Sequence, residues 1–312
     1  MKLTGKTVLI VGGAGFLGSH LAEGFLGQGA SVRVFDVFSS GSRANLASIE
    51  KEIEFIRGDA NCYDQVRKAA KGVDVIIHTS FPMPLCDRSL ENQHVATGIV
   101  GLFNCLRSAY EENAFFVYSS SISVYGIQEY TPIDEKHPVH PLLLYGATKL
   151  AGEYYCDVMY RNYDLPLVIL RFSDLYGPRC ARLSAPLAFL LNCLQDEPII
   201  IKGGGKQVRT YTYIKDAVDA TILAVCSEKA RGEVINVAGD ESISIYDLAN
   251  LAQDVTGKSP GLIILDDSED IRQYRIDNRK AKQLLNFYPQ VKMSEGLKLT
   301  WDWLQENYSY YL

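Results

Sequence analysis

The stretch Thr7-Val-Leu-Ile-Val11 leads directly into Gly12-Gly-Ala-Gly15-Phe-Leu-Gly18, and Val32-Arg-Val-Phe-Asp36 follows about one helix length later. The first segment is apolar and rich in β-branched residues, as expected of a buried strand. Residues Ser19 to Gln28 have helical periodicity and end at Gly29. The second apolar segment is a further strand that ends in an acid. The sequence therefore opens with a βαβ unit whose first turn is rich in glycine.

The glycines and the acid of this unit are spaced as in a dinucleotide-binding site. Gly12 would form a tight turn, Gly15 would let the backbone approach a pyrophosphate, and Gly18 would permit close packing of helix and strand. The following helix offers unpaired N–H groups to the phosphates. Asp36 can accept both hydroxyls of an adenosine ribose and would repel a 2′-phosphate. We therefore expect NAD rather than NADP, with Arg43 as the nearby cation that would weaken this preference.

Strands and helices continue to alternate along the chain. We expect strands at 53–57, 73–78, 115–118, 167–170, 199–202 and 234–237, and helices at 94–111, 145–163, 185–195, 216–226, 245–255 and 293–307. This alternation predicts an α/β fold with a doubly wound parallel Rossmann sheet and a smaller mixed α/β C-terminal substrate subdomain. Residues 1–178 would form the NAD-binding Rossmann domain, with the chain crossing back near 208–240, and residues 179–312 would be mainly the substrate-binding subdomain.

Composition and charge exclude several other classes of protein. The net charge of -6 and the absence of a long basic run argue against nucleic acid as a partner. No window approaches the roughly 18 apolar residues of a membrane span. The 7 cysteines are odd in number, scattered, and without a Cys-x-x-Cys pair. We therefore expect reduced thiols, no metal site and a cytoplasmic protein.

Tyr145-Gly-Ala-Thr-Lys149 places a phenol and an ammonium one helical turn apart on the same face. An ammonium beside a phenol favours the phenolate and lowers the tyrosine pKa from about 10. Tyr145 is therefore a candidate general base. Ser121, which ends the run that begins at Ser119, could hold the same substrate oxygen by a hydrogen bond. The alternative is that Tyr145 is an ordinary residue of the core or its rim.

Two further features each allow two interpretations. Asp59, at the end of the strand 53–57, could accept the adenine amino group or could cap the next helix. In the helix 94–111, an apolar stripe on one side would be core or a dimer interface; it comprises Val95, Ile99, Leu102, Phe103 and Leu106. The loop Thr79-Ser-Phe-Pro82 follows a strand at its carboxyl end, where open α/β sheets bind ligands.

Taken in order, these motifs resemble the extended short-chain dehydrogenase/reductase family. The motifs are the glycine loop, Asp36, Gly58-Asp59, the serine run with Val124-Tyr-Gly126, Tyr145-xxx-Lys149, and Arg171 through Gly177-Pro178. The resemblance continues through Gly205–Arg209, Asp216–Ala220, Asn236–Gly239 and Asp277–Pro289 to Glu295-Gly-Leu297, and so covers nearly the whole chain. Within the family, the sequence is most similar to nucleotide-sugar epimerases and dehydratases of the UDP-glucose 4-epimerase type.

The resemblance implies a role for each matching residue. NAD would be bound by Gly12, Gly15, Phe16, Leu17, Gly18, Asp36, Asp59, Ala60, Thr79, Ser80, Ser119, Tyr145 and Lys149. Ser121, Tyr145 and Lys149 would be catalytic. A nucleotide sugar would contact Ser121, Asp174, Arg209 and Arg272, and the two arginines suit a diphosphate. Family members usually form homodimers through two helices of each subunit, which match 94–111 and 145–163.

The resemblance also implies a chemistry. Tyr145 would remove the proton of the C4 hydroxyl as hydride passes to NAD, and an epimerase would return the hydride to the other face of the 4-keto sugar. Dehydratases of the family carry Asp-Glu, and decarboxylases Glu, directly after the residue that matches Ser121. Ile122-Ser123 in those positions favour an NAD-dependent epimerase acting at C4. A keto-sugar reductase, a dehydratase, another dehydrogenase and a non-catalytic nucleotide-binding regulator are the alternatives.

Three positions depart from the family pattern. Asp174 and Gly98 each stand where family members have asparagine, and Thr79-Ser-Phe-Pro82 replaces the usual Leu-Ala-Ala after His78. These positions surround the expected sugar and nicotinamide. They leave the identity of the sugar open.

Overall fold

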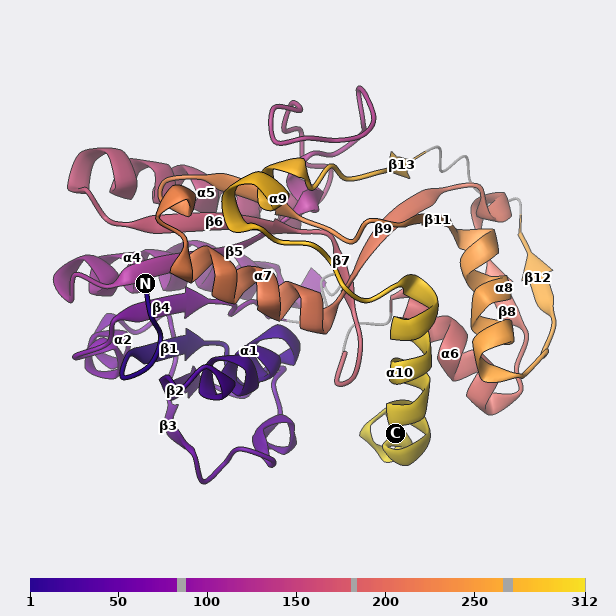
Figure 1. The fold of residues 1–312 in the computed structure, drawn as a ribbon, viewed down its shortest axis with the longest axis horizontal. Helices are drawn as coiled ribbons and strands as arrows, with labels where there is room; N and C mark the ends of the chain where they lie inside the picture. The colour runs from indigo at the N-terminus through magenta and orange to yellow at the C-terminus, as the bar shows by residue number, and fades with distance from the viewer. Residues whose placement is uncertain (83–87, 181–183, 266–271, 312) are drawn as a thin grey trace.

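The computed structural model describes residues 1–82, 88–180, 184–265 and 272–311 (Figure 1). Its centre is a sheet of seven strands in the order β3–β2–β1–β4–β5–β6–β10. The strands are β1 (Thr7–Val11), β2 (Ser31–Asp36), β3 (Ile53–Arg57), β4 (Val75–His78), β5 (Phe115–Ser121), β6 (Leu167–Phe172) and β10 (Val234–Val237). Every neighbouring pair is parallel. The predicted doubly wound parallel sheet is confirmed.

Helices cover both faces of this sheet. One face carries α1 (Phe16–Gly27), α7 (Ile214–Cys226) and α9 (Arg279–Leu285). The other face carries α2 (Tyr63–Ala70), α4 (Leu102–Glu111) and α5 (Leu144–Tyr163). Because strands buried on both faces need apolar side chains on both, the strand sequences are nearly continuous hydrophobic runs.

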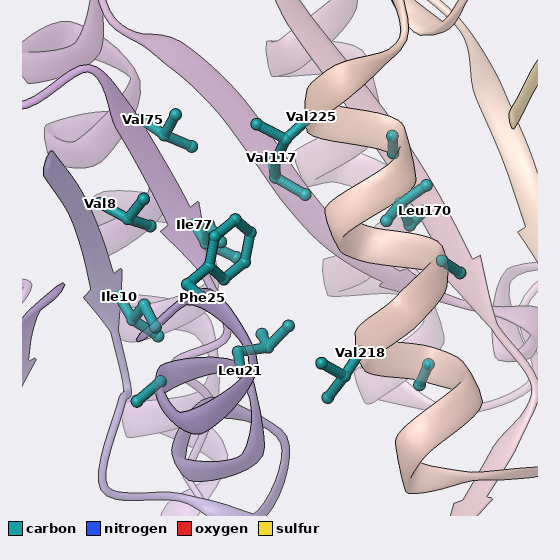
Figure 2. Close-up of a cluster of buried hydrophobic side chains, with 14 of the residues drawn as sticks. Val8, Ile10, Leu21, Phe25, Val75, Ile77, Val117, Leu170, Val218 and Val225 are labelled. Atoms are coloured by element: carbon teal, nitrogen blue, oxygen red, sulfur yellow. The ribbon is translucent and has the colours of Figure 1, made fainter. Parts of the chain in front are cut away.

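The two cores follow from the alternation of side chains along each strand. Val8 and Ile10 of β1 point to the face of α1 and α7, where Figure 2 shows them on the side of Phe25 and Leu21, with Val218 of α7 beyond Leu21. Leu9 and Val11, which alternate with them along β1, belong to the opposite core. Gly24 brings α1 close to α7, since a Cβ at this position would lie 2.4 Å from Cγ1 of Val218.

A smaller region lies at one end of the molecule (Figure 1). Its helices are α6 (Ala185–Gln195), α8 (Ile245–Thr256) and α10 (Met293–Glu306), and its strands are β7 (Asp174–Tyr176), β8 (Ile199–Ile201), β9 (Val208–Tyr213), β11 (Ser242–Ser244), β12 (Leu262–Ile264) and β13 (Gln273–Tyr274). β9 pairs antiparallel with β11 and parallel with β7 and β13, so this sheet is mixed. Between these elements the chain returns to the large sheet through α7 and β10. The domain boundary at 178 stays a prediction.

The helix expected at 94–111 differs from the prediction in one respect. It begins with α3 (Glu91–Val95), continues through a π-helical segment, η3 (Ala96–Gly101), and ends with α4. Leu102 and Leu106 are buried, whereas Val95 and Phe103 are 44% and 43% exposed. The expectation that these residues share one side is therefore wrong. The wider π turn changes the direction of Val95 relative to the residues that follow it, and Phe103 lies about 100° around the helix from Leu102.

Short one-turn helices complete the described chain. They are η1 (Arg43–Leu46), η2 (Arg88–Leu90), η4 (Ile122–Val124), η5 (Gly203–Gly205), η6 (Glu228–Ala230) and η7 (Tyr308–Tyr311). In the described ranges, no helix has the length and apolar character that a bilayer span requires. The described cysteines form no disulfide with one another, and Cys86 lies outside the described residues.

Candidate active site

Three neighbouring cavities lie at the carboxyl ends of the parallel strands, and together they border every residue predicted for the site. The inner cavity, of about 210 Å³, is lined by Gly12, Gly15, Phe16, Leu17, Gly18, Thr79, Ser119, Ser121, Tyr145, Lys149 and Asp174. The outer cavity, of about 370 Å³, is lined by Ser121, Tyr145, Asp174, Arg209 and Arg272. A small third cavity is lined by Gly12, Asp36, Asp59, Ala60 and Ser80. Ser121, Tyr145 and Asp174 thus stand at the junction of the inner and outer cavities.

The glycine loop is shaped for an anion. Gly12 has a positive φ of 82°, and a Cβ at Gly18 would lie 2.2 Å from the carbonyl oxygen of Gly12. α1 begins at Phe16 rather than at Ser19, with Gly15 as an N-cap that makes no side-chain hydrogen bond. The first turn carries no acidic residue. Its N–H groups therefore face the inner cavity without a side-chain cap, as a phosphate site requires.

Asp36 is held at the end of β2 in two ways. One carboxylate oxygen accepts the N–H of Ala14 at 2.9 Å, and the other accepts the N–H of Phe38 at 2.7 Å. Burial raises the pKa of this carboxyl group, and the backbone hydrogen bonds oppose that shift. The side chain therefore also fixes the glycine loop, a role that the sequence did not reveal. Arg43 pairs with Glu50, so that its charge is directed to another carboxylate.

The hydrogen bonds of Asp59 exclude one of its two interpretations, that it caps the next helix. Its carboxylate accepts the N–H of Asn61 at 2.9 Å. α2 begins after Cys62 and has no side-chain cap, so the interpretation of Asp59 as a helix cap is wrong. The neighbouring Ala60 is fixed by its carbonyl oxygen, which accepts a hydrogen bond from Asn104 at 2.9 Å.

Tyr145 and Lys149 lie in the first turns of α5, on the face toward the inner cavity. The Lys149 ammonium donates to the carbonyl oxygen of Ser119 at 2.7 Å and lies 5.7 Å from the centroid of the Tyr145 ring. Burial lowers the pKa of Lys149 to about 8, against an opposing effect of the nearby Glu153 carboxylate. At neutral pH Lys149 therefore still carries most of its positive charge, next to the phenol.

Ser121 is oriented by a residue that the sequence did not single out. The Ser123 hydroxyl donates to Oγ of Ser121 at 3.0 Å, and the Ser123 N–H donates to the same oxygen at 3.2 Å. With both acceptor positions used, the Ser121 O–H is left to donate toward the cavity. Ser123 is thus a positioning residue for Ser121.

Arg209 and Arg272 meet around one aromatic ring in the outer cavity. The guanidinium carbon of Arg209 lies 4.7 Å from the centroid of the Tyr274 ring. Burial raises the pKa of the Tyr274 phenol, and the charges of Arg209 and Arg272 together with a hydrogen bond from Arg272 oppose that shift. β9 and β13 bring the three together, because Arg209 and Tyr274 are register partners. Tyr274 was not predicted.

Comparison with known proteins identifies the family of this chain. A model of the NAD dependent epimerase/dehydratase family matches residues 8–238. The chain belongs to this family.

Relatives within the NAD-dependent epimerase/dehydratase family differ in their reactions. A Bacillus subtilis (strain 168) protein named as an uncharacterized UDP-glucose epimerase, YtcB, is 33% identical over 93% of this chain and 95% of its own length. A UDP-N-acetyl-alpha-D-glucosaminuronate decarboxylase of Bacillus cytotoxicus is 30% identical over 96% and 98%. The structure of a UDP-glucuronic acid 4-epimerase of Bacillus cereus with UDP-glucuronic acid and NAD is 30% identical, with a TM-score of 0.88 over 96% and 99%. Family membership confirms NAD as the cofactor. It does not distinguish between the epimerase and decarboxylase reactions for which these relatives are named.

Gly98, one of the departures from the family pattern, is explained by close packing next to Tyr145. A Cβ at Gly98 would lie 2.2 Å from Cγ2 of Thr148 and 3.1 Å from the Phe81 ring. Phe81 in turn packs edge-on against Tyr145, with ring centroids 4.9 Å apart. The small residue at 98 and the large residue at 81, where family members carry Asn and Ala, therefore compensate for each other.

A buried network of hydrogen bonds, with one ion pair, includes Ser120, the neighbour of Ser121. Arg171 donates to both carboxylate oxygens of Glu153, at 2.9 and 2.6 Å, and Ser120 donates to Glu153 at 2.5 Å. Arg171 also donates to Tyr125 at 3.0 Å, and Tyr125 donates to Asn236 of β10 at 2.6 Å. Two sequence signals could have revealed the pair: Glu153 is one turn beyond Lys149, and Arg171 ends an apolar strand that needs a buried partner.

Proposed function

We propose that this protein is an NAD-dependent nucleotide-sugar epimerase that acts at C4 through a transient 4-keto sugar. The observation that carries the proposal is the position of Ser121 and Tyr145 on the border between two cavities. One cavity has the glycine loop and Lys149, and the other has Arg209 and Arg272. A dinucleotide in the first and a sugar diphosphate in the second would meet at the Tyr145 phenol.

The described residues fit NAD on physical grounds. The glycine loop leaves room that a Cβ would fill, and the uncapped start of α1 favours a pyrophosphate. Asp36 borders the small cavity with Asp59 and Ala60, which suits an adenosine. Bound NAD would supply reversible oxidation of the sugar carbon.

The residues of this chain would then move and hold the proton. Tyr145 takes the proton of the C4 hydroxyl, and Ser121 donates a hydrogen bond to the same oxygen. Lys149 keeps a positive charge beside the phenol. Arg209 and Arg272 hold the diphosphate while the 4-keto sugar turns over, and Tyr145 returns the proton to the oxygen of the new epimer.

The region after β5 supports epimerisation over elimination or decarboxylation. Those reactions need a further acid near C5 or C6, and Ile122 and Ser123 line the outer cavity directly after Ser121. Among the described residues that line the inner and outer cavities, the carboxylate is Asp174. It lies on β7, away from the position that the family's dehydratases and decarboxylases use.

A substrate panel tests the proposal. The purified protein is incubated with UDP-, dTDP-, GDP- and CDP-sugars, the products are separated, and absorbance at the NADH wavelength is followed. We expect a C4 epimer of one substrate without net formation of NADH, and NAD retained through purification. Steady accumulation of NADH would instead identify a dehydrogenase, and loss of water or carbon dioxide would identify a dehydratase or decarboxylase.

We further infer that the protein is a homodimer through α3–α4 and α5. The outer faces of these helices carry exposed apolar side chains, namely Val95, Val100, Phe103, Tyr110, Tyr154, Tyr155, Val158 and Tyr163. Phe103 and Tyr155 lie in ring contact across the two helices, as do Tyr110 and Tyr163. Exposed apolar side chains gathered on neighbouring helices favour association. Light scattering should give twice the chain mass, and a monomer mass at micromolar concentration would contradict the inference.

A further inference from the structure

The Lys149 ammonium is buried beside a neutral carbonyl group and two aromatic rings. Lys149 is 4% exposed, and its ammonium donates to the carbonyl oxygen of Ser119 at 2.7 Å. The rings of Phe81 and Tyr118 lie 5.3 and 5.2 Å from the ammonium. Burial favours the uncharged form of a lysine. A positive charge beside Tyr145 therefore requires support from a nearby anion.

Glu153 is a carboxylate on the same helix face as Lys149. It follows Lys149 by four residues on α5, so the two side chains lie one turn apart. Glu153 is 6% exposed, so solvent and salt screen its charge little. Burial lowers the pKa of Lys149 to about 8, and Cys156 and Glu153 oppose that shift. Both of these residues of α5 are therefore candidates for supporting the ammonium.

The other titratable groups packed around Lys149 are uncharged at neutral pH. Burial raises the pKa of the Cys156 thiol well above its usual value, so this group carries no charge. Burial also raises the pKa of the Tyr118 phenol of β5 and lowers the pKa of His78 of β4 to about 3, so both are neutral. Within the described core around Lys149, Glu153 is therefore the group that supplies a negative charge.

Arg171 and Ser120 hold the Glu153 carboxylate in place. Arg171 donates to its two oxygens at 2.9 and 2.6 Å, and the Ser120 hydroxyl donates at 2.5 Å. Ser120 and Arg171 are register partners on β5 and β6, so both reach the carboxylate from the sheet. Charge-assisted hydrogen bonds of this kind are short and directional. The sheet therefore fixes the negative charge that lies one turn from Lys149.

We propose that Glu153 is a positioning residue of the active site, whose carboxylate keeps the Lys149 ammonium charged beside Tyr145. It lines none of the three cavities and therefore acts through Lys149 rather than on NAD or the sugar. Its effect on turnover rests on the proposed function, whereas its effect on Lys149 requires no substrate. Replacing a buried ion pair with apolar residues is often neutral for stability, so stability alone does not account for the pair of Glu153 and Arg171.

Titration of Lys149 in the NAD-loaded protein tests this role without turnover. Lysine labelled with ¹³C at Cε is followed by NMR as the pH is raised, and the signal of Lys149 is the one missing from Lys149→Met. Glu153→Gln should lower the midpoint of this signal by about one pH unit or more, because it removes one charge and keeps the size. Cys156→Ser should leave the midpoint unchanged, because the thiol carries no charge at neutral pH.

An exposed carboxylate on the same helix is the matched control. Asp157 lies one turn beyond Glu153, and its side chain is 43% exposed. Asp157→Asn should keep the wild-type midpoint, because solvent screens its charge. The Gln, Ser and Asn variants all retain Tyr145 and Asp174, which border the inner cavity with Lys149.

A second variant guards against loss of the fold. Glu153→Gln leaves the Arg171 guanidinium buried without its anion, whereas Glu153→Gln/Arg171→Met removes both charges. The double variant should also titrate at lower pH than the wild type, because Cys156 and Glu153 are the groups that oppose the effect of burial on the pKa of Lys149. A wild-type midpoint in either folded variant would overturn the proposal.

Turnover at two pH values separates this role from a structural one. Near pH 8, about half of Lys149 is charged in the wild type and about a tenth in Glu153→Gln, so turnover should fall about fivefold. Near pH 6, Lys149 is charged in both proteins and turnover should be nearly equal. An equal loss at both pH values would make Glu153 a structural residue only. If no nucleotide sugar is turned over, the proposed function fails, and the titration of Lys149 still decides the role of Glu153.

Discussion

Replacing Tyr145 with phenylalanine is expected to lower turnover by about 100- to 10,000-fold, the range by which a positioned general base accelerates a reaction. The substitution removes one oxygen and keeps the ring, so the edge-on contact with Phe81 and the position of α5 should persist. The rate of formation of the C4 epimer, measured at saturating substrate, checks this expectation.

NAD binding supplies the control for this substitution. The glycine loop, Asp36 and Lys149 are untouched, so the affinity for NAD should change little. Tyr160→Phe is a matched variant, since Tyr160 lies on the same helix, outside the proposed dimer face, and is 37% exposed. It should retain wild-type turnover. Wild-type turnover in Tyr145→Phe would remove this residue from the mechanism.

Replacing Arg171 with methionine is expected to lower the free energy of unfolding by about 3–5 kcal/mol, the usual cost of removing one partner of a buried ion pair. The side chains of Arg171 and Glu153 are 7% and 6% exposed, so the Glu153 carboxylate would remain buried without its cation. Tyr125 would lose a donor as well. The midpoint and slope of urea unfolding measure the loss.

A second ion pair on the same helix provides the comparison. Arg161 pairs with Asp157 on α5, but its side chain is 72% exposed. Arg161→Met should therefore change the unfolding midpoint little, because solvent screens exposed pairs. In the double variant Arg171→Met/Glu153→Gln, part of the lost stability should return, since no charge is left buried. Equal losses at the exposed and buried sites would contradict this account.

The sequence predicted the architecture because its signals are local. The apolar run, glycine loop and acid of residues 7–36 describe one continuous βαβ unit, and the alternation of strand and helix extends it. The structure agrees with this order, and boundaries differ by a few residues. All predicted site residues border one of the three cavities. Parallel strands bring their carboxyl ends to one edge of the sheet, so residues far apart in sequence meet there.

The features that the sequence missed depend on side chains meeting across elements. The pair of Glu153 and Arg171 joins α5 to β6, and the compensation between Gly98 and Phe81 joins a π-helical turn to a loop. The π turn itself shifted the apolar stripe of residues 95–106, because periodicity analysis assumes a regular helix. The roles of Ser121, Tyr145 and Lys149 in catalysis stay predictions until the variants are measured.

The late return of the chain to the large sheet has a consequence for biosynthesis. β10 pairs with β6 and carries Asn236, which completes the hydrogen bonds of Tyr125. On the ribosome, β6 is therefore made long before the strand that covers its edge. A nascent chain that ends before residue 234 exposes a bare parallel strand and an unfinished polar network. Translation pauses in the segment between these strands would thus lengthen the exposure to aggregation, and chaperone capture is best timed there.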